Sequence, residues 1–315
     1  MRYGETDRQS DHVEDRRGRG GGGLFPGGGG GVVIPIGGGG RGLGLGWLLV
    51  IGIGCLLLGI NPLRLITGGG LTMPDMPKPQ TRTGAPDLPG LPGRPSVGQS
   101  TDEMGTFVRR VLADNEDVWT RVFASAGKQY HKPTLVLFSG ATATACGPGQ
   151  SAMGPFYCPI DQKIYVDLAF YDFMKRRFGA QGDFAQAYVI AHEIGHHVQN
   201  LLGIADAVQQ AKMRTGSEVE ANALQVRMEL QADCLAGVWA SLNEQVRSRL
   251  EPGDIEEGIR AAAAIGDDMI QRRTQGYVVP DAFTHGSSAQ RVKWFRRGLE
   301  SGQVKACDTF SAQDL

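Results

Sequence analysis

Cysteine and net charge are both scarce in this chain of 315 residues. Only five cysteines occur, and because none has the CxxC spacing of structural zinc sites, a metal site built from cysteines is not expected. A formal net charge of -1 gives no case for a nucleic-acid partner. The arginine- and glycine-rich stretch 16–41 has Phe25 as its one aromatic residue, which favours a disordered tail over an RNA-binding segment.

Charge is missing altogether between Arg41 and Arg64. As a helix, this stretch is long enough to span roughly 30 Å of hydrocarbon, so the sequence predicts one transmembrane helix over 42–62. A cleaved signal peptide fits less well, because a long segment precedes the stretch and no convincing cleavage site follows it. Arginines are more frequent before the stretch than after it, which predicts a single-pass membrane protein with its N-terminus in the cytoplasm and its C-terminal part outside.

Composition divides the chain into four predicted parts. These are a disordered Gly/Arg-rich cytoplasmic tail (1–41), the transmembrane helix (42–62), a Gly/Pro-rich linker (63–100) and one domain with its own core (101–315). Apolar periodicity in the last part predicts four helices, near 102–123, 183–202, 217–239 and 254–275, and an inner strand over 134–138. The fold class is therefore α+β, mostly helical with a small sheet.

Alternating apolar and polar residues over 163–170 predict a half-buried strand shortly before the second of these helices. An extended peptide that paired with the edge of such a strand would be positioned by main-chain hydrogen bonds. An ordinary sheet edge without any ligand predicts the same alternation.

The segment from Ala191 to His197 reads AHEIGHH and carries the pattern HExxH. Histidines four residues apart lie on one face of a helix, so His192 and His196 can direct ring nitrogens at the same zinc ion. Glu193 then stands beside the metal, where its carboxylate can take a proton from a metal-activated water and return it to the leaving amine. Helical periodicity around the motif favours this interpretation over a chance match.

A catalytic zinc needs a third protein ligand, and Glu229 is the best candidate. It lies on the helix that the capping string beginning at Ser217 predicts, one turn before Asp233, among small and apolar residues. A zinc ion would satisfy the carboxylate of Glu229, and an N–H of a metal-bound histidine would satisfy Asp233. The alternative is a solvated Glu/Asp pair that faces water.

HEIGHHVQ followed by ELQAD (229–233) resembles the gluzincin pattern. Longer strings resemble one family, the "putative neutral zinc metallopeptidases" anchored in bacterial membranes: AMGPFYC (152–158), GDFAQAY (182–188), GYVVPD (276–281) and FTHGSSAQR (283–291). The resemblance implies a zincin-like domain with one Zn2+ per chain on His192, His196 and Glu229, with Glu193 as the base, in the bacterial inner membrane. It implies no particular substrate.

Peptide hydrolysis builds an oxyanion that a nearby hydrogen-bond donor can stabilise, and His285 is the candidate for that role. It precedes a capping string that begins at Ser287, and a capping or loop histidine is the competing interpretation. Tyr277 is a weaker candidate for the same role. The remaining histidines receive no functional role: His12 lies in a polar tail, His131 precedes a strand, and His197 points off the metal face.

Cys55 lies in the predicted span, and the other four cysteines form an even set compatible with disulfides in an oxidising compartment. Cys146 and Cys158 bracket a Gly/Pro-rich loop, so pairing these two is preferred, which leaves Cys234 for Cys307. Sequence alone leaves all three pairings open.

These observations predict a membrane-anchored zinc peptidase that acts on a peptide or protein. Two alternatives stay open: a zinc amidase that acts on a cell-wall amide, and a non-catalytic tethered scaffold that keeps zinc for stability. Glu193 argues against the scaffold, because a structural zinc site needs no base and fills its fourth position with protein.

Overall fold

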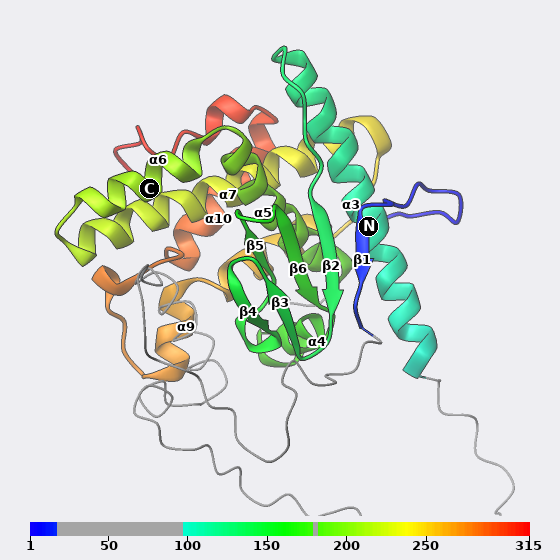
Figure 1. Cartoon of the computed structure of the whole chain (residues 1–315), viewed down its shortest axis with the longest axis horizontal. Coiled ribbons are helices and arrows are strands. Elements are labelled where there is room, and N and C mark those ends of the chain that lie inside the picture. The colour runs from blue at the N-terminus through cyan, green and yellow to red at the C-terminus, as the bar shows by residue number, and fades with distance from the viewer. Residues whose placement is uncertain (18–96, 179–181) are drawn as a thin grey trace, which may run out of the picture.

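The computed structural model describes residues 1–17, 97–178 and 182–315. These ranges form a mostly helical α+β fold with a small sheet, as predicted (Figure 1). The helices are α3 (Val97–Ser125), α4 (Ala169–Phe178), α5 (Asp183–Leu201), α6 (Ile204–Arg214), α7 (Glu218–Arg247), α8 (Asp254–Ala264), α9 (Asp267–Thr274) and α10 (Ser288–Ser301). Three short 3-10 helices are η1 (Ser151–Met153), η2 (Pro280–Ala282) and η3 (Val304–Cys307).

The sheet has the strand order β1-β2-β6-β5. Its strands are β1 (Val13–Asp15), β2 (Thr134–Phe138), β6 (Lys163–Asp167) and β5 (Phe156–Cys158), and a separate hairpin joins β3 (Ala141–Thr144) to β4 (Gly147–Gln150). The first three strands run parallel, and β5 is antiparallel to β6. The inner position predicted for 134–138 is confirmed.

The prediction of a half-buried edge strand over 163–170 was wrong in two respects. The strand β6 ends at Asp167, and α4 begins at Ala169. It lies inside the sheet with its last four residues buried, because β2 pairs along one side and β5 along the other. The edge strand next to α5, the helix that carries HExxH, is therefore β5. A strand of only three residues gives too little alternation to be recognised from sequence.

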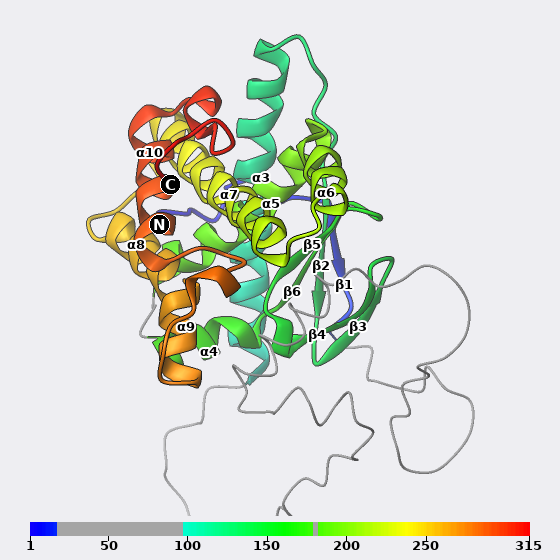
Figure 2. The same ribbon diagram turned by 90° about the vertical axis from the view of Figure 1, so that its left-hand side faces the viewer.

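Residues 1–17 were predicted to belong to a disordered tail, but they pack on the domain. Val13 pairs with Leu135 at the start of β1, which extends the sheet beside β2 (Figures 1 and 2). Arg8 forms an ion pair of 2.9 Å with the fully buried Glu116 of α3, and Asp7 forms one of 2.7 Å with Arg249. Composition failed here because these charges are satisfied by partners far away in the sequence, which a local average does not see.

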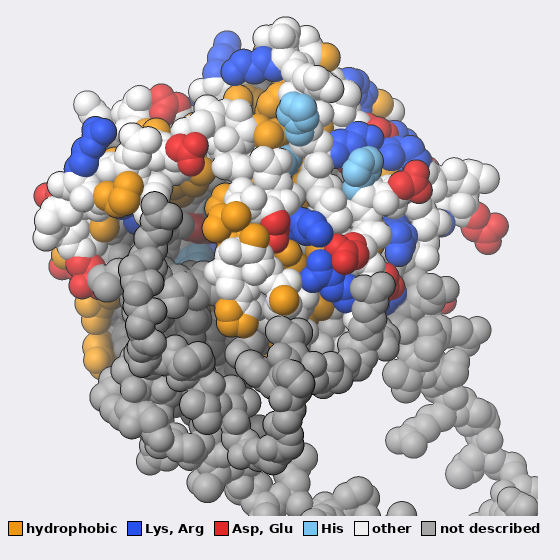
Figure 3. Space-filling model, viewed as in Figure 1, with side chains coloured by type: hydrophobic (Ala, Val, Ile, Leu, Met, Phe, Trp, Pro, Cys, Tyr) orange, Lys and Arg blue, Asp and Glu red, His pale blue; other side chains and the backbone are white. Residues whose placement is uncertain are grey.

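Charged side chains of both signs are interspersed over the sheet on the face that Figure 3 shows. Glu14 of β1 pairs with Arg16 at 2.8 Å and with Lys163 at 3.0 Å. The first of these pairs is local to the N-terminal segment, whereas the second connects it to β6. The segment is thus held to the domain by ion pairs as well as by backbone hydrogen bonds.

Two glycines let α10 lie directly on α7. A Cβ added to Gly298 would lie 1.9 Å from the carbonyl oxygen of Cys234, and one added to Gly237 would lie 2.1 Å from that of Phe295. Both distances are far below van der Waals contact, so only glycine permits this approach. Trp239, Trp294 and Phe295 are buried around the crossing.

A single helix predicted over 254–275 is instead two helices, α8 and α9, separated at Gly266. A Cβ at Gly266 would lie 2.4 Å from the backbone nitrogen of Ser288, so the chain turns where it meets the start of α10.

The structure joins Cys146 to Cys158 and Cys234 to Cys307, the pairing preferred on sequence grounds.

The predicted transmembrane helix (42–62) and linker (63–100, apart from the start of α3) lie outside the described residues. Among the helices that the structure does describe, none is long and apolar enough to cross a membrane.

Candidate metal centre

The motif HExxH lies in the middle of α5, whose inner face is buried along most of its length. The helix begins after Gly182, whose φ of 114° favours glycine. Gly182 offers no side-chain cap, and the carboxylate of Glu257 accepts a hydrogen bond from the backbone N–H of Phe184. At the other end, Gly203 has a φ of 75° and separates α5 from α6, close to the predicted end of the helix.

Three candidate ligand groups converge where α5 crosses α7. The Nε2 atoms of His192 and His196 lie 3.2 Å and 3.5 Å from the same carboxylate oxygen of Glu229. Tetrahedral zinc with ligand distances of roughly 2.0–2.1 Å places neighbouring ligand atoms about 3.3 Å apart. The predicted set of His192, His196 and Glu229 is therefore brought together at the spacing that zinc requires.

Gly195 favours this convergence. A Cβ on Gly195 would lie 3.0 Å from both the Cα and the carbonyl oxygen of Ala232 on α7. That is tighter than ordinary contact, so a side chain there would require α7 to shift slightly away from α5. Within the variable positions of HExxH, this glycine therefore contributes to helix packing.

Hydrogen bonds at the far side of each ring fix the orientation of both histidines. Nδ1 of His192 lies 2.8 Å from the carboxylate of Asp233, as the sequence analysis expected of a metal-bound histidine. Nδ1 of His196 lies 2.9 Å from Oε1 of the buried Gln199, whose Nε2 donates to the carbonyl oxygen of Met228 at 2.7 Å. With Nδ1 as the donor in each ring, Nε2 keeps its lone pair for a metal.

Gln199 was not identified from the sequence. It lies three residues after His196, and a glutamine at that distance on a helix is common enough to give no signal. Its orientation becomes visible only through its contacts with α7, where Gln231 lies 3.0 Å away.

The carboxylate of Asp233 is fully buried and has partners on two other helices. In addition to His192 it accepts hydrogen bonds from the hydroxyl of Tyr188, at 2.5 Å, and from Arg291, at 2.8 and 2.9 Å. The competing interpretation of Glu229 and Asp233 as a solvated pair is wrong, since both are buried.

Glu193 lies close enough to His192, His196 and Glu229 for their charges to shift the pKa of its carboxyl. Its residue is 8% exposed, and no side chain in the three described ranges donates a hydrogen bond to its carboxylate. Burial raises the pKa of this carboxyl, whereas the neighbouring His192 and His196 lower it, and the net shift is upward. A carboxylate with a raised pKa and a free lone pair suits a general base.

His285 lies close enough to Glu229 for each to shift the pKa of the other. Burial lowers the pKa of His285, but Asp267 and then Glu229 raise it above its ordinary value. Nδ1 of His285 lies 3.3 Å from Asp267, whose carboxylate also accepts from the backbone N–H groups of Thr284, His285 and Gly286. Asp267 therefore fixes both the loop and the ring, a role that no sequence pattern indicated.

The other three histidines lie outside the cluster around Glu229. His131 and His197 contact each other, and His12 contacts Glu116. Nε2 of His197 donates to the carbonyl oxygen of His131, and its Nδ1 lies 3.0 Å from the hydroxyl of Tyr157. Burial lowers the pKa of His197 to about 4, so it is neutral. His12 lies 3.2 Å from Glu116 rather than in a free tail. The side chain of Tyr277, the weaker candidate for the oxyanion, is 63% exposed.

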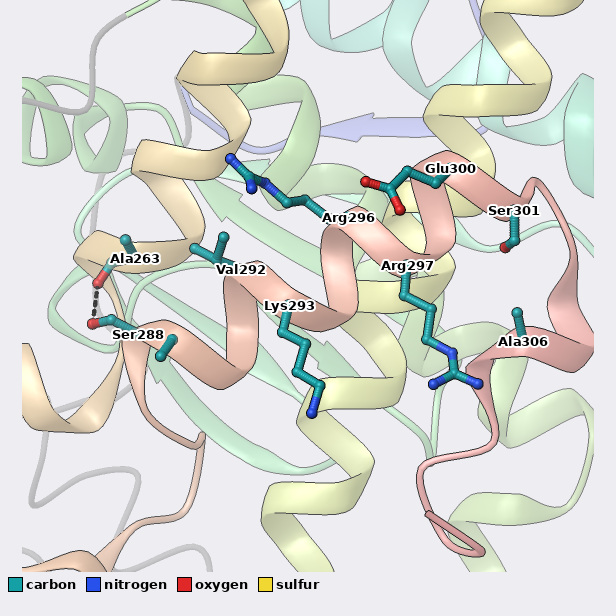
Figure 4. A pocket seen from close by; sticks show the side chains of 10 residues that line it. Ala263, Ser288, Val292, Lys293, Arg296, Arg297, Glu300, Ser301 and Ala306 are labelled. Carbon is teal, nitrogen blue, oxygen red and sulfur yellow. Dashed lines mark hydrogen bonds between the residues drawn. The ribbon is translucent and has the colours of Figure 1, made fainter. Parts of the chain in front are cut away.

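A groove on the outer face of α10 contains none of these residues. Figure 4 shows Lys293, Arg296 and Arg297 along it, with the hydroxyl of Ser288 bonded to the carbonyl oxygen of Ala263 at one end. It carries no group that binds metal at the spacing found between α5 and α7. The convergence on Glu229 is therefore the candidate site.

The family profile described as "Putative neutral zinc metallopeptidase" matches residues 1–310. This chain belongs to that family. Two similar proteins are "Uncharacterized protein YpfJ" of Escherichia coli strain K12, 47% identical over 303 residues and 96% of each chain, and "Uncharacterized protein Rv2575" of Mycobacterium tuberculosis strain H37Rv, 49% identical over 197 residues, or 59% of this chain and 65% of the relative. No solved structure was found to match.

Zinc affinity is expected to rise with pH in this member of the zinc metallopeptidase family. Burial alone lowers the pKa of His192, but Asp233 and Glu229 raise it to about 10, and the pKa of His196 is raised as well. A ring whose pKa is raised holds a second proton, which zinc must displace before Nε2 can bind it, so lowering the pH weakens binding. Competition with a chromophoric chelator at pH 6, 7 and 8 measures this. An affinity that is flat over this range contradicts the histidine ligands.

Proposed function

We propose that this protein is a zinc-dependent peptidase that hydrolyses peptide bonds, with a zincin-like catalytic domain. The observation that carries the proposal is the meeting of His192, His196 and Glu229 at the spacing of a three-ligand zinc site. Glu193 lies near them, and no side chain in the described ranges donates a hydrogen bond to its carboxylate. Three ligands leave a fourth position open, which distinguishes a catalytic site from a structural one. One Zn2+ per chain is expected.

Zinc bound here would supply a Lewis acid and lower the pKa of a water molecule to roughly 7. Glu193 takes the proton of the attacking water and later delivers it to the leaving amine. Asp233 and Gln199 keep the rings of His192 and His196 in the tautomer that these steps need.

His285 is proposed to donate a hydrogen bond to the carbonyl oxygen that becomes negative during attack. Replacing it, His285→Ala, should lower kcat by about 10²- to 10³-fold, as for other oxyanion donors, and leave zinc content and KM little changed. Steady-state kinetics on a defined peptide measures the effect, with His131→Ala as the control because His131 is exposed and its hydrogen bond to His197 comes from its backbone carbonyl. Equal kcat values for His285→Ala and the unmodified protein exclude the role.

The outer edge of β5 suits an extended peptide. Among the described residues, Phe156–Cys158 pairs with β6 alone, and Tyr157 contacts His197, the residue that follows the proposed ligand His196. A substrate that pairs with the open side would run along the site by main-chain hydrogen bonds, with side-chain pockets left to set specificity. This favours a peptide over the cell-wall amide of the alternative proposal, and Glu193 disfavours the scaffold.

The first test is the zinc content of the full chain in detergent, followed by chelator-sensitive cleavage of an unfolded protein such as casein. A fragment that begins after the linker is unsuitable, because it would lack β1 and leave the buried Glu116 without Arg8. Stoichiometric zinc with cleavage that chelators abolish supports the peptidase. A chain that binds no zinc contradicts it.

The domain and its N-terminal segment are proposed to lie together in the oxidising compartment, attached to the bacterial inner membrane. Two disulfides support an oxidising location for the domain. A single crossing by 42–62 would put residues 1–17 on the opposite side from β2, which is incompatible with the pairing of Val13 and Leu135. The predicted cytoplasmic N-terminus is therefore not retained.

A further inference from the structure

We propose that Arg291 is a positioning residue for the zinc ligand His192 and acts through Asp233. The inference rests on the proposed zinc site and adds a residue on α10, a helix that supplies none of the ligands. Arg291 is one of three arginines on that helix, with Arg296 and Arg297.

Arg291 and Asp233 form a two-pronged, buried contact. Nε of Arg291 lies 2.9 Å from one carboxylate oxygen of Asp233 and Nη2 lies 2.8 Å from the other. The exposed fractions are 1% for Arg291 and 0% for Asp233. A guanidinium that holds both oxygens of a carboxylate fixes its plane as well as its position, which a single hydrogen bond does not do.

The plane of Asp233 determines where His192 points. The oxygen that receives Nη2 of Arg291 is the same Oδ1 that lies 2.8 Å from Nδ1 of His192. If the carboxylate rotated, Nδ1 would lose its acceptor and the ring would be free to turn. Held in place, the ring directs Nε2 to the oxygen of Glu229 at 3.2 Å.

Nη2 of Arg291 also lies 3.4 Å from Nδ1 of His192. Both atoms are donors when Nδ1 carries the proton shared with Asp233, so this contact is not a hydrogen bond in that tautomer. It keeps the proton of Nδ1 directed at Asp233, because the guanidinium accepts none. Tyr188 belongs to the same network: its hydroxyl donates a hydrogen bond to Asp233 and accepts one from Nη2 of Arg291 at 3.3 Å.

Arg291 reaches Asp233 because α10 lies in backbone contact with α7. Gly298 and Gly237 allow that approach two turns or less from the pair. Among the carboxylates in the described part of the chain, Asp233 is the one that forms an ion pair with Arg291. Burying a guanidinium is costly unless a carboxylate compensates it, so the arginine and the aspartate work as one unit.

The test is the zinc dissociation constant, measured by chelator competition on the full chain. Arg291→Met should weaken zinc binding about tenfold, at the lower end of the effect usual for groups behind a ligand, and Asp233→Asn should weaken it by about 10- to 100-fold. Arg291→Lys keeps the charge without the fork and should lie between the unmodified protein and Arg291→Met. Arg297→Met, an exposed arginine of the same helix, is the matched control and should bind zinc normally.

The double variant separates positioning from general structure. If Arg291 acts through Asp233, adding Arg291→Met to Asp233→Asn should change zinc affinity by less than the tenfold seen alone. An equal loss in both backgrounds, or unchanged affinity in Arg291→Met, overturns the inference. If Arg291→Met fails to fold by circular dichroism, a folded Arg291→Lys with full affinity overturns it. Absence of zinc from the unmodified chain would instead remove the proposed function.

Discussion

A Glu193→Gln variant should keep its zinc and lose turnover by roughly 10²- to 10⁴-fold, the share that a positioned general base contributes. Glutamine has the same shape but cannot accept the proton of the attacking water. The variant should also fold normally, because no side chain in the described ranges depends on the Glu193 carboxylate for a hydrogen bond. Zinc content per chain and kcat on one defined peptide, measured on the same preparation, provide the two readouts.

Glu229→Ala is the matched comparison. Glu229 contacts both histidines, so its loss should weaken zinc binding by more than the roughly 10- to 100-fold that follows loss of a group behind a ligand. The two variants should therefore separate: one keeps the metal without turnover, and the other loses the metal. Equal loss of zinc in both would show that Glu193 is a ligand and not the base.

Local patterns in the sequence predicted the parts of the site that lie on single helices. The spacing of His192 and His196 needs no tertiary information, because four residues on a helix fix one face. Glu229 and Asp233 followed from two carboxylates set among apolar residues. The capping box at Ser287, also a local pattern, is confirmed.

Groups that depend on helix crossings were not predictable in this way. Gln199 lies on α5 but is oriented by its contacts with α7, whereas Asp267 on α9 and Arg291 on α10 reach the site from other helices. Gly195 is an informative intermediate case. It stands inside a recognised motif, yet its contact with Ala232 depends on the neighbouring helix, so the motif alone gave no reason for it.

Errors in the sheet had a similar origin. Alternation over 163–170 indicated a strand with one buried face. A period of two does not show whether a strand has neighbours on both sides, so it cannot distinguish an inner strand from an edge strand. The N-terminal segment was misjudged because its charges looked solvated. Glu116 is completely buried on α3, and three basic groups around it, from Arg8, His12 and Lys132, make that burial possible.

If the protein is attached to a membrane as proposed, residues 1–17 should lie on the same side of it as residues 101–315, and labelling should show this as an all-or-none result. The family profile spans both, from residue 1 to 310, and β1 joins them in one sheet. Breaking this contact would expose the sheet edge at β2 and leave Glu116, buried on α3, without Arg8. Retaining the contact is therefore favoured over a crossing that separates the two parts.

Single cysteines at exposed positions provide the measurement. In a chain with Cys55→Ser, Asp11→Cys reports on the N-terminal segment and Glu300→Cys on the domain, since both residues are exposed. A maleimide that cannot cross membranes, added to bacterial spheroplasts, should label both positions or neither. Both labelled means that the two parts lie outside, where the disulfides form. Labelling of Glu300→Cys with protection of Asp11→Cys would support the single crossing first predicted. It would also mean that β1 does not pair with β2 in the membrane-attached protein.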